Sequence, residues 1–454
     1  MTSSRELCWT ARETGRELDG AAVFAALFAA EPVAFWLDSS RSVPGLSPLS
    51  VLGTSAGPDA EVLTYRVGDG DDLFDLLRKR LAVSGTPDPA LPEGFKGGYV
   101  GYFGYELKAL TGGSRAHLAP TPDALWIWAN RFVLIDPERD RTWFVAVHRE
   151  QDAADALAWI EYAQQACRRP PEVATPAIAA LEIEPHLELS REQYLAAIGV
   201  CRAALEAGQT YEVCLTTRVR LPAVSDPLGF YLWQRKRNPA PYAAFVRWHD
   251  LAIASSSPER FLTVGTDRWA ECRPIKGTAP RSDDPDRDRA NAERLAVDEK
   301  TRAENLMIVD LIRNDLGRVS VPGTVQVPGL MRVESYATVH QLVTTVRGRL
   351  REGVDALDAV RACFPPGSMT GAPKLRTMEI LDALEPSARG VYSGALGYLG
   401  VDGRADLSVV IRTAVMTPEE TVVGAGGAIV LDSVPQDEYD EMVLKATAAV
   451  RGFG

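Results

Sequence analysis

Short apolar runs alternate with turn residues along the first 169 residues of this chain, and the runs are rich in β-branched and aromatic residues. This pattern is typical of strands. The expected strands are Val33–Leu37, Ala60–Val67, Ala124–Trp128 and Thr142–Val147. Two further segments, Asp72–Leu81 and Asp152–Cys167, have apolar residues at helical spacing and predict helices. We therefore expect residues 1–169 to form an α+β region.

A proline-rich stretch follows this region. Residues 170–189 contain four prolines and almost no periodicity, which predicts a linker. Ser190 then precedes a helix over Tyr194–Ala207, with Gln193 at the capping-box position. The strands expected next are Tyr211–Leu221, Ala243–Trp248 and Leu251–Ser255. The alternating Asp and Arg residues of 281–300 predict a solvated loop that leads into a charged helix. Residues 190–454 thus form a second region.

A lysine stands beside a glycine in the segment Arg273–Thr278. Lys276 lies between the apolar Ile275 and Gly277, where the backbone can approach a ligand closely. A lysine desolvated at such a position is expected to be a neutral amine, and hence a candidate nucleophile. The alternative is an exposed lysine in a turn.

The segment Arg302–Gly317 is apolar on nearly every side, which predicts a buried helix that ends at Gly317. Glu304 lies on the same face as Ile308. A carboxylate in so apolar a helix is costly unless it meets a cation, so a metal ion or a buried arginine is expected nearby.

A glycine-rich strand, Val422–Val430, precedes the last helix. It lacks the spacing of a dinucleotide-binding loop. The helix begins at Pro435 and carries Glu438 and Glu441 on one face, with Lys445 one turn beyond. These residues form either a solvated, salt-bridged face or, together with the buried carboxylate described above, a set of oxygen ligands for Mg²⁺, which binds through few carboxylates and keeps several waters.

The loop Cys363–Lys374 leads into a helix over Leu375–Leu384. Pro373 suits the first helical turn, so the loop directs backbone N–H groups, the Thr370 hydroxyl and Lys374 toward one place. We expect an anion site there. It is not a Walker loop, because no G-K-[ST] sequence occurs.

Composition excludes several classes of protein. The six cysteines form no C-x-x-C pair, which argues against a thiolate zinc site and a disulfide framework. The net charge of -12 argues against a nucleic-acid partner. The apolar run Ala21–Ala30 is too short to span a bilayer and has no signal-peptide flank, so a cytoplasmic protein with no membrane partner is expected.

The helix containing Glu304, the loop Phe364–Lys374 and the segment Gly424–Lys445 together resemble the chorismate-binding enzymes. This family includes anthranilate, isochorismate, salicylate and aminodeoxychorismate synthases. Within it, Pro274–Thr278 is similar to aminodeoxychorismate synthases, since anthranilate synthases usually have alanine in place of the lysine, and Gly367–Gly371 points the same way. The resemblance implies an α+β fold of large, mostly antiparallel sheets with helices packed outside, in which the two regions pack together.

The same resemblance implies a reaction in which chorismate and ammonia give 4-amino-4-deoxychorismate, the precursor of 4-aminobenzoate. Lys276 would add at C2 as hydroxide leaves C4, with Glu259 giving the proton, and ammonia would then enter at C4 and expel the lysine. Mg²⁺ held by Glu304 and Glu441, with Glu438 acting through water, would hold the ring carboxylate.

Further residues are implied to bind the substrate. They are Thr370, Gly371, Lys374, Tyr392, Arg412, Gly426 and Gly427. Of these, Arg412 and the two glycine backbones, with the tyrosine nearby, would hold the enolpyruvyl carboxylate. Glu212 departs from the family pattern, because relatives often carry glutamine there, or in isochorismate formers a lysine that activates water. Gln341 stands where many relatives have histidine, and the choice between His340 and Gln341 stays open.

Ammonia is expected from a separate glutamine amidotransferase subunit, because no cysteine lies in a nucleophile-elbow setting. Two alternatives remain: a C2-aminating enzyme that makes anthranilate or 2-amino-2-deoxyisochorismate, and a catalytically idle chorismate-binding subunit. Some relatives also hold tryptophan in the N-terminal half, and Leu37–Ser40 is the candidate for its pocket.

Overall fold

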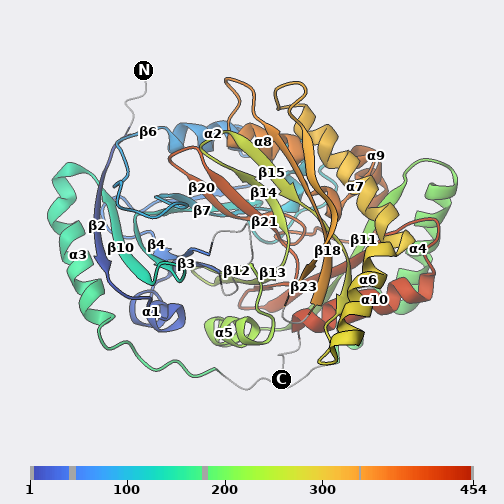
Figure 1. Ribbon diagram of the computed structural model, residues 1–454, viewed down its shortest axis with the longest axis horizontal. Coiled ribbons are helices and arrows are strands. Elements are labelled where there is room, and N and C mark those ends of the chain that lie inside the picture. The colour runs from blue at the N-terminus through green and yellow to red at the C-terminus, as the bar shows by residue number, and fades with distance from the viewer. Residues whose placement is uncertain (1–4, 40–47, 176–181, 337–338, 451–454) are drawn as a thin grey trace.

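Two large sheets hold most of the strands (Figure 1). The computed structural model describes residues 5–39, 48–175, 182–336 and 339–450. Within these ranges, one sheet has 11 strands and the other has 10, and every pairing described in either sheet is antiparallel. The predicted fold class is confirmed.

The strand order of each sheet shows how the chain is arranged. Across the 11-stranded sheet the strands are β19 (Gly371–Ala372), β11 (Glu212–Pro222), β23 (Glu420–Ile429), β22 (Thr413–Met416), β13 (Leu251–Ser257), β12 (Tyr242–Trp248), β3 (Val33–Asp38), β4 (Ser50–Thr54), β9 (Arg131–Asp136), β10 (Arg141–His148) and β2 (Cys8–Thr14). Across the 10-stranded sheet they are β16 (Ile275–Pro280), β18 (Val339–Arg349), β15 (Trp269–Arg273), β14 (Arg260–Val264), β21 (Ala405–Val409), β20 (Ala395–Gly400), β7 (Gly98–Phe103), β8 (Ala124–Ala129) and β5 (Val62–Tyr65), and β17 (Gln326–Ser335) pairs with β18 beside this path. A separate parallel pair is formed by β1 (Arg5–Glu6) and β6 (Val83–Ser84).

Helices cover the outer faces of the sheets (Figure 1). They are α1 (Gly20–Leu27), α2 (Leu73–Leu81), α3 (Ala153–Ala166), α4 (Arg191–Glu206), α5 (Pro227–Arg237), α6 (Pro285–Val297), α7 (Glu299–Gly317), α8 (Ala356–Cys363), α9 (Lys374–Leu384) and α10 (Pro435–Val450). One apolar core contains residues of both sheets and of α2, α7 and α8. A second core lies between the 11-stranded sheet and helices that include α1, α3, α4, α5 and α10.

Each sheet contains strands of both sequence regions, and within each sheet the strands of one region lie together and meet those of the other at a single pairing. In the 11-stranded sheet β3 pairs with β12 on one side and β4 on the other, and in the 10-stranded sheet β7 lies between β20 and β8. The stretch 170–189, of which residues 176–181 lie outside the described part, therefore does not separate one sheet from another.

Local signals in the sequence agree with the helix ends. Ser190 accepts a hydrogen bond from the Gln193 backbone, and the Gln193 side chain accepts one from the Ser190 N–H, so the predicted capping box is present. The charged run 281–300 differs from the expected loop, because it contains α6. The Asp284 side chain caps this helix and Pro285 occupies its first turn, which favours helix over loop.

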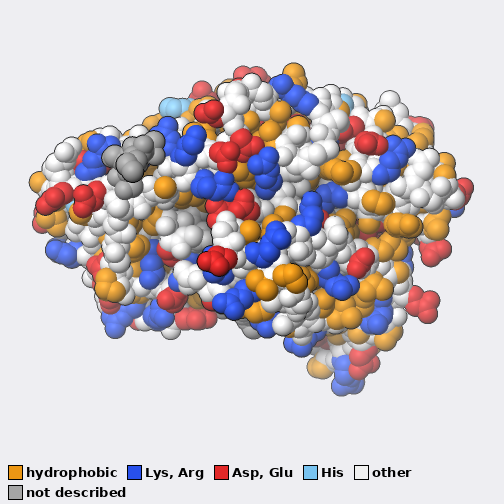
Figure 2. All heavy atoms as spheres, turned by 90° about the horizontal axis from the view of Figure 1, so that it is seen from above, with side chains coloured by type: hydrophobic (Ala, Val, Ile, Leu, Met, Phe, Trp, Pro, Cys, Tyr) orange, Lys and Arg blue, Asp and Glu red, His pale blue; other side chains and the backbone are white. Residues whose placement is uncertain are grey.

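On the face seen in Figure 2, acidic and basic side chains lie side by side across the middle, so neither sign of charge dominates. A site for an anion on this face would therefore depend on the few groups next to it. In the described part of the chain, no helix combines the length and the apolar character needed to cross a bilayer.

Candidate active site

Lys276 lies on β16 at a bulge in the pairing with β18, between Ile275 and Thr278. Gly277 makes the bulge possible, since its φ is +79° and a Cβ there would stand 2.3 Å from Thr301 of α7. This close contact is with α7, and the predicted close approach of the backbone to a ligand stays a prediction. The side chain of Lys276 is buried, and its ammonium donates to Glu212 Oε1 at 2.5 Å.

The expectation of a neutral lysine is wrong. Burial lowers the pKa of Lys276, but the carboxylates of Glu212 and Glu304 raise it by more, so the pKa lies above the usual lysine value. The resting enzyme holds an ammonium ion at this position. Any nucleophilic role requires a group that takes its proton.

Glu259 lies between β13 and β14, and its side chain is buried. Burial raises the pKa of its carboxyl group to about 7, although a hydrogen bond from Ser368 and the charge of Lys276 lower it. A small pocket is lined by Glu259 together with Gly367 and Ser368. A carboxyl group that is protonated near neutral pH can act as a proton donor there.

Three carboxylates face a common group of lysines at the junction of α7 and α10. Lys300 Nζ lies 2.6 Å from Glu438 Oε1 and 3.9 Å from Glu304 Oε1. Lys445 Nζ lies 2.7 Å from Glu441 Oε1, as the salt-bridged reading of this helix face predicts. Burial raises the pKa of Glu304 to about 7, with Glu212 and Glu438 adding to the rise, whereas Lys276 and Lys300 lower it.

This donor set fits a divalent cation in its chemistry. Mg²⁺ needs only one or two carboxylates and keeps several waters, and a cation would stabilise the charged form of the buried Glu304 carboxyl group, whose pKa is raised mainly by burial. Within the described ranges, no three His, Cys, Asp or Glu side chains converge closely enough to form a complete metal site. Here Lys300 and Lys445 supply the positive charge instead.

The predicted anion loop lies against the edge of the 11-stranded sheet. Gly371 and Ala372 form β19 and pair with Val213 and Glu212 of β11. Gly371 has φ +140°, and a Cβ there would stand 2.0 Å from the Glu212 carbonyl oxygen. Glycine is therefore required at this position because the backbone of β11 leaves no room for a side chain.

The two polar side chains of this loop make structural contacts. Thr370 is buried and its hydroxyl donates at 3.3 Å to the carbonyl of Pro366. Lys374 Nζ donates to Asp315 Oδ2 at 2.7 Å and to the Cys363 carbonyl at 2.6 Å. These contacts fix the loop to α7 and α8, and substrate binding by either side chain stays a prediction.

Arg412 carries the features of an anion-binding residue. Its backbone has φ +51°, a conformation uncommon outside glycine. Burial lowers its pKa, and no carboxylate among the described residues forms an ion pair with it. A desolvated guanidinium of this kind is stabilised by an incoming carboxylate.

Glycines of β23 admit neighbouring side chains. A Cβ at Gly424 would stand 2.2 Å from the Tyr392 ring, so the buried tyrosine packs directly on this strand. Gly427 faces the α10 carboxylates, since a Cβ there would stand 3.5 Å from Glu438 Oε2. The carbonyl of Gly426 accepts a hydrogen bond from Lys445 at 3.3 Å.

The structure adds residues that the sequence did not single out. Lys300 lies one turn before Glu304, and this i,i+4 spacing is the signal by which it could have been found. Arg389 is buried and donates to both oxygens of Glu385, to the Met369 carbonyl and to the Cys214 carbonyl, so it ties the loop before β19 to β11. No motif in the sequence indicates that network.

The positions of His340 and Gln341 bear on which of the two lies nearer to Lys276. The His340 ring contacts Asp288 at 3.0 Å and Ser335 at 2.8 Å, which couples β18 to α6. Gln341 pairs with Thr278, two residues beyond Lys276. Gln341 is therefore the nearer of the two along the sheet register.

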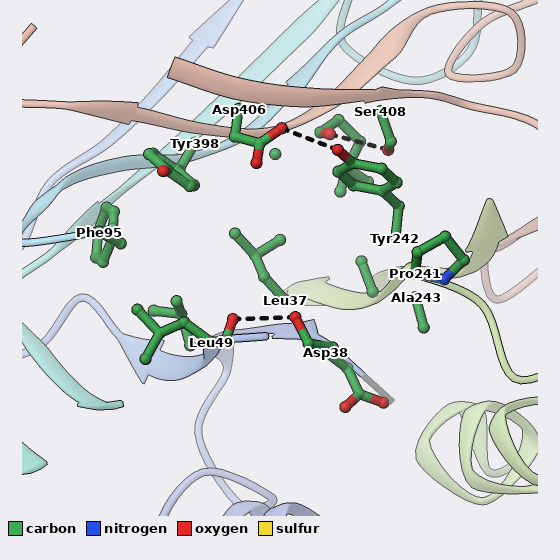
Figure 3. Close-up of a pocket in the computed structure, with 15 residues that line it drawn as sticks. Leu37, Asp38, Leu49, Phe95, Pro241, Tyr242, Ala243, Tyr398, Asp406 and Ser408 are labelled. Carbon is green, nitrogen blue, oxygen red and sulfur yellow. Dashed lines mark hydrogen bonds between the residues drawn. The ribbon is translucent and has the colours of Figure 1, made fainter. Parts of the chain in front are cut away.

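A second cavity is lined by residues of both sequence regions (Figure 3). It has an empty volume of about 570 Å³ and is lined by Leu37, Asp38, Phe95, Tyr242, Tyr398 and Asp406 among others. The hydroxyl of Tyr242 donates to Asp406 at 3.3 Å across one wall. The tryptophan-pocket candidate Leu37–Ser40 falls on this cavity, except that Ser40 lies outside the described residues, and tryptophan binding stays a prediction.

The fold and the site together define a class of enzyme in which a buried lysine, a buried carboxyl group of raised pKa and a cluster of glutamates lie near one another. A family model described as chorismate binding enzyme matches residues 34–451. The chain therefore belongs to the chorismate binding enzyme family, which confirms the predicted resemblance.

Individual relatives are consistent with this assignment. The chain is 48% identical to an aminodeoxychorismate synthase of Streptomyces pristinaespiralis, over 96% of this chain but only 64% of that relative's length. It is 41% identical to aminodeoxychorismate synthase component 1 of Salmonella typhimurium, over 84% of this chain and 82% of the relative. Anthranilate synthase component I of Streptococcus pneumoniae has a similar structure, with a TM-score of 0.76, 28% identity, and coverage of 90% of this chain and 93% of that one.

Proposed function

We propose that this chain converts chorismate and ammonia to 4-amino-4-deoxychorismate. The observation that carries the proposal is Lys276, which lies buried beside the acidic carboxyl group and the glutamate cluster. The relatives named aminodeoxychorismate synthase support it, because the two described above match 96% and 84% of this chain.

The residues divide the chemistry between them. Lys276 Nζ attacks C2 of the ring, and the protonated Glu259 gives its proton to the hydroxyl that leaves C4. Arg412 holds the enolpyruvyl carboxylate as a counter-ion. Ammonia then attacks C4 and the bond from C2 to the lysine breaks.

Magnesium is proposed to be held by Glu304 and Glu441, with Glu438 acting through water. When bound, Mg²⁺ supplies positive charge for the ring carboxylate of the substrate. Lys300 and Lys445 would leave their carboxylate partners or shift when the ion enters. A separate glutamine amidotransferase subunit in the cytoplasm is proposed as the source of ammonia.

The competing function is amination at C2, and the lysine is the feature against it. A nitrogen bonded to C2 blocks that carbon and directs ammonia to C4. In Lys276→Ala, we expect a steep fall in 4-amino-4-deoxychorismate, by about 10²-fold or more, with residual product aminated at C2. Product analysis by liquid chromatography and mass spectrometry separates the two isomers.

A direct test uses wild-type protein mixed with chorismate and Mg²⁺ without ammonia. Mass spectrometry is expected to find an adduct on the peptide that contains Lys276. Lys79→Ala, on the exposed side of α2, serves as the control and is expected to keep wild-type activity. Formation of the 4-amino product by Lys276→Ala at a near wild-type rate would contradict the covalent mechanism.

The ammonia source gives a second test. The purified chain is expected to aminate chorismate with an ammonium salt, faster as alkaline pH increases the NH₃ fraction, and to use glutamine poorly. Steady-state assays with each nitrogen donor check this. Robust glutamine-dependent activity of the chain alone would contradict the proposed separate subunit, and turnover of chorismate without either donor would contradict the proposed amination.

A further inference from the structure

The ammonium of Lys276 has one close partner among the described contacts, and that partner is Glu212. Their 2.5 Å separation joins residues 64 positions apart in the sequence. The Glu212 side chain is fully buried, and its second oxygen, Oε2, has no hydrogen-bond partner in the described part of the chain. A buried carboxylate oxygen without a partner is costly, which favours a functional role for this side chain.

The backbone holds this carboxylate in a fixed place. Glu212 begins β11 and pairs with Ala372 of β19, next to the anion loop. Its carbonyl also accepts from the Thr210 hydroxyl at 3.0 Å. Since strand pairing fixes the main chain, the side chain has little freedom to leave the lysine.

Other charged and titratable groups act on Lys276 from greater distance. They are Glu304 on α7, Cys214 on β11, Glu259 between β13 and β14, and Glu441 on α10. None of these four forms a hydrogen bond or ion pair with the lysine among the described residues, whereas Glu212 does. A proton leaving Nζ therefore has a direct route to one carboxylate.

We propose that Glu212 is the base that takes the proton from Lys276 and returns it at the end of the cycle. This inference rests on the proposed function, because it supplies the step that turns the resting ammonium into a nucleophile. It also gives a role to the residue at which the chain departs from its family pattern.

Protons and electron pairs are conserved through the proposed cycle. The proton moves from Nζ to Glu212, the freed lone pair forms the bond to C2, the ring double bonds shift, and the C4–O bond breaks as Glu259 protonates the oxygen to give water. Ammonia then forms the C4–N bond while the C2–N bond breaks. The C4 ammonium returns a proton to Glu259, and the released lysine amine regains its proton from Glu212.

The test measures single-turnover formation of the Lys276 adduct without ammonia, across pH, in wild type, Glu212→Gln and Glu212→Asp. Glutamine keeps the size of the side chain but accepts no proton, so adduct formation near neutral pH is expected to fall by about 10²–10⁴-fold. The Glu212→Gln rate is also expected to gain a limb that rises with pH, because the lysine then loses its proton to solvent. Aspartate is expected to restore part of the rate without that limb.

Control measurements separate this role from a structural one. Glu420→Gln removes a partly exposed carboxylate that pairs with Arg220 near the far end of β11, and it is expected to leave the rate unchanged. Thermal unfolding of each variant reports the fold. Wild-type rate and pH profile in Glu212→Gln would overturn the inference, and so would a loss that is equal at every pH and is not relieved by aspartate.

The measurement on wild type distinguishes the proposed role of Glu212 from the proposed covalent mechanism of Lys276. If wild type forms the adduct while Glu212→Gln forms it equally fast, only the role of Glu212 is lost. If wild type forms no adduct on Lys276, the covalent mechanism fails and the role of Glu212 fails with it.

Discussion

At the scale of residues, the site places ionisable groups in protonation states that differ from those in water. Burial raises the pKa values of Glu259 and Glu304 to about 7 each, whereas Glu212 and Glu304 keep Lys276 charged. In the proposed mechanism the acid, Glu259, is therefore available near neutral pH, whereas the nucleophile, Lys276, must first lose a proton within the site.

Replacing a glutamate of the proposed metal cluster tests its function at this scale. Glu304→Gln or Glu441→Gln is expected to lower Mg²⁺-dependent turnover by about 10²–10³-fold, because each removes charge and not packing. Titration calorimetry is expected to show weaker Mg²⁺ binding, with little change in unfolding temperature. The matched control is Glu299→Gln, which changes an exposed residue on the same helix. Normal Mg²⁺ affinity in both variants would remove these glutamates from the site.

Sequence alone predicted the residue types of the site but not the charge on the lysine. Lys276, Glu259 and the three metal-site glutamates were expected together, and the pKa effects show that their charges act on one another. The protonation state depends on Glu212, which reaches the lysine from a different sheet. Such a contact leaves no periodic signal in the sequence.

At the scale of elements, β23 presents glycines to two different neighbours. Gly424 accommodates the Tyr392 ring, whereas Gly427 faces α10. Helices with caps, such as α4 after Ser190, were predictable because their signals are local. The pairing of β11 with β23 was not, since it joins segments 200 residues apart through backbone groups that every residue carries.

Replacing each glycine by alanine tests whether Gly424 is packed more tightly than Gly427. Gly424→Ala places a Cβ 2.2 Å from the Tyr392 ring, so we expect the free energy of unfolding to fall by about 1–3 kcal/mol. In Gly427→Ala the nearest atom is 3.5 Å away, and the change is expected to stay within about 0.5 kcal/mol. Urea denaturation compares the two. Equal losses would show that the ring does not pack as described.

At the scale of the whole molecule, the two sequence regions complete each other's sheets. The strand β3 lies between β12 and β4, and β7 lies between β20 and β8. The sequence predicted an α+β fold with packed halves but not this order, because strand order depends on long-range pairing. The proline-rich stretch is a change in composition, not a boundary between sheets.

Separate expression of the two regions tests whether each needs the strands of the other. Residues 190–454 alone are expected to show no cooperative thermal transition, because β12 and β20 each lose a paired strand. Circular dichroism and hydrogen exchange measure this. Co-expression with residues 1–169 is expected to restore the transition. A sharp transition in the isolated fragment would show that the second region folds independently.

The position of β22 and β23 has a consequence for synthesis on the ribosome. These strands, residues 413–429, insert between β11 and β13, which leave the ribosome some 160 to 200 residues earlier. Until they emerge, the inner edges of β11 and β13 stay unpaired, and exposed strand edges promote aggregation. The nascent chain therefore cannot close its larger sheet until synthesis is almost finished, and we expect its yield in cells to depend on chaperones that shield those edges.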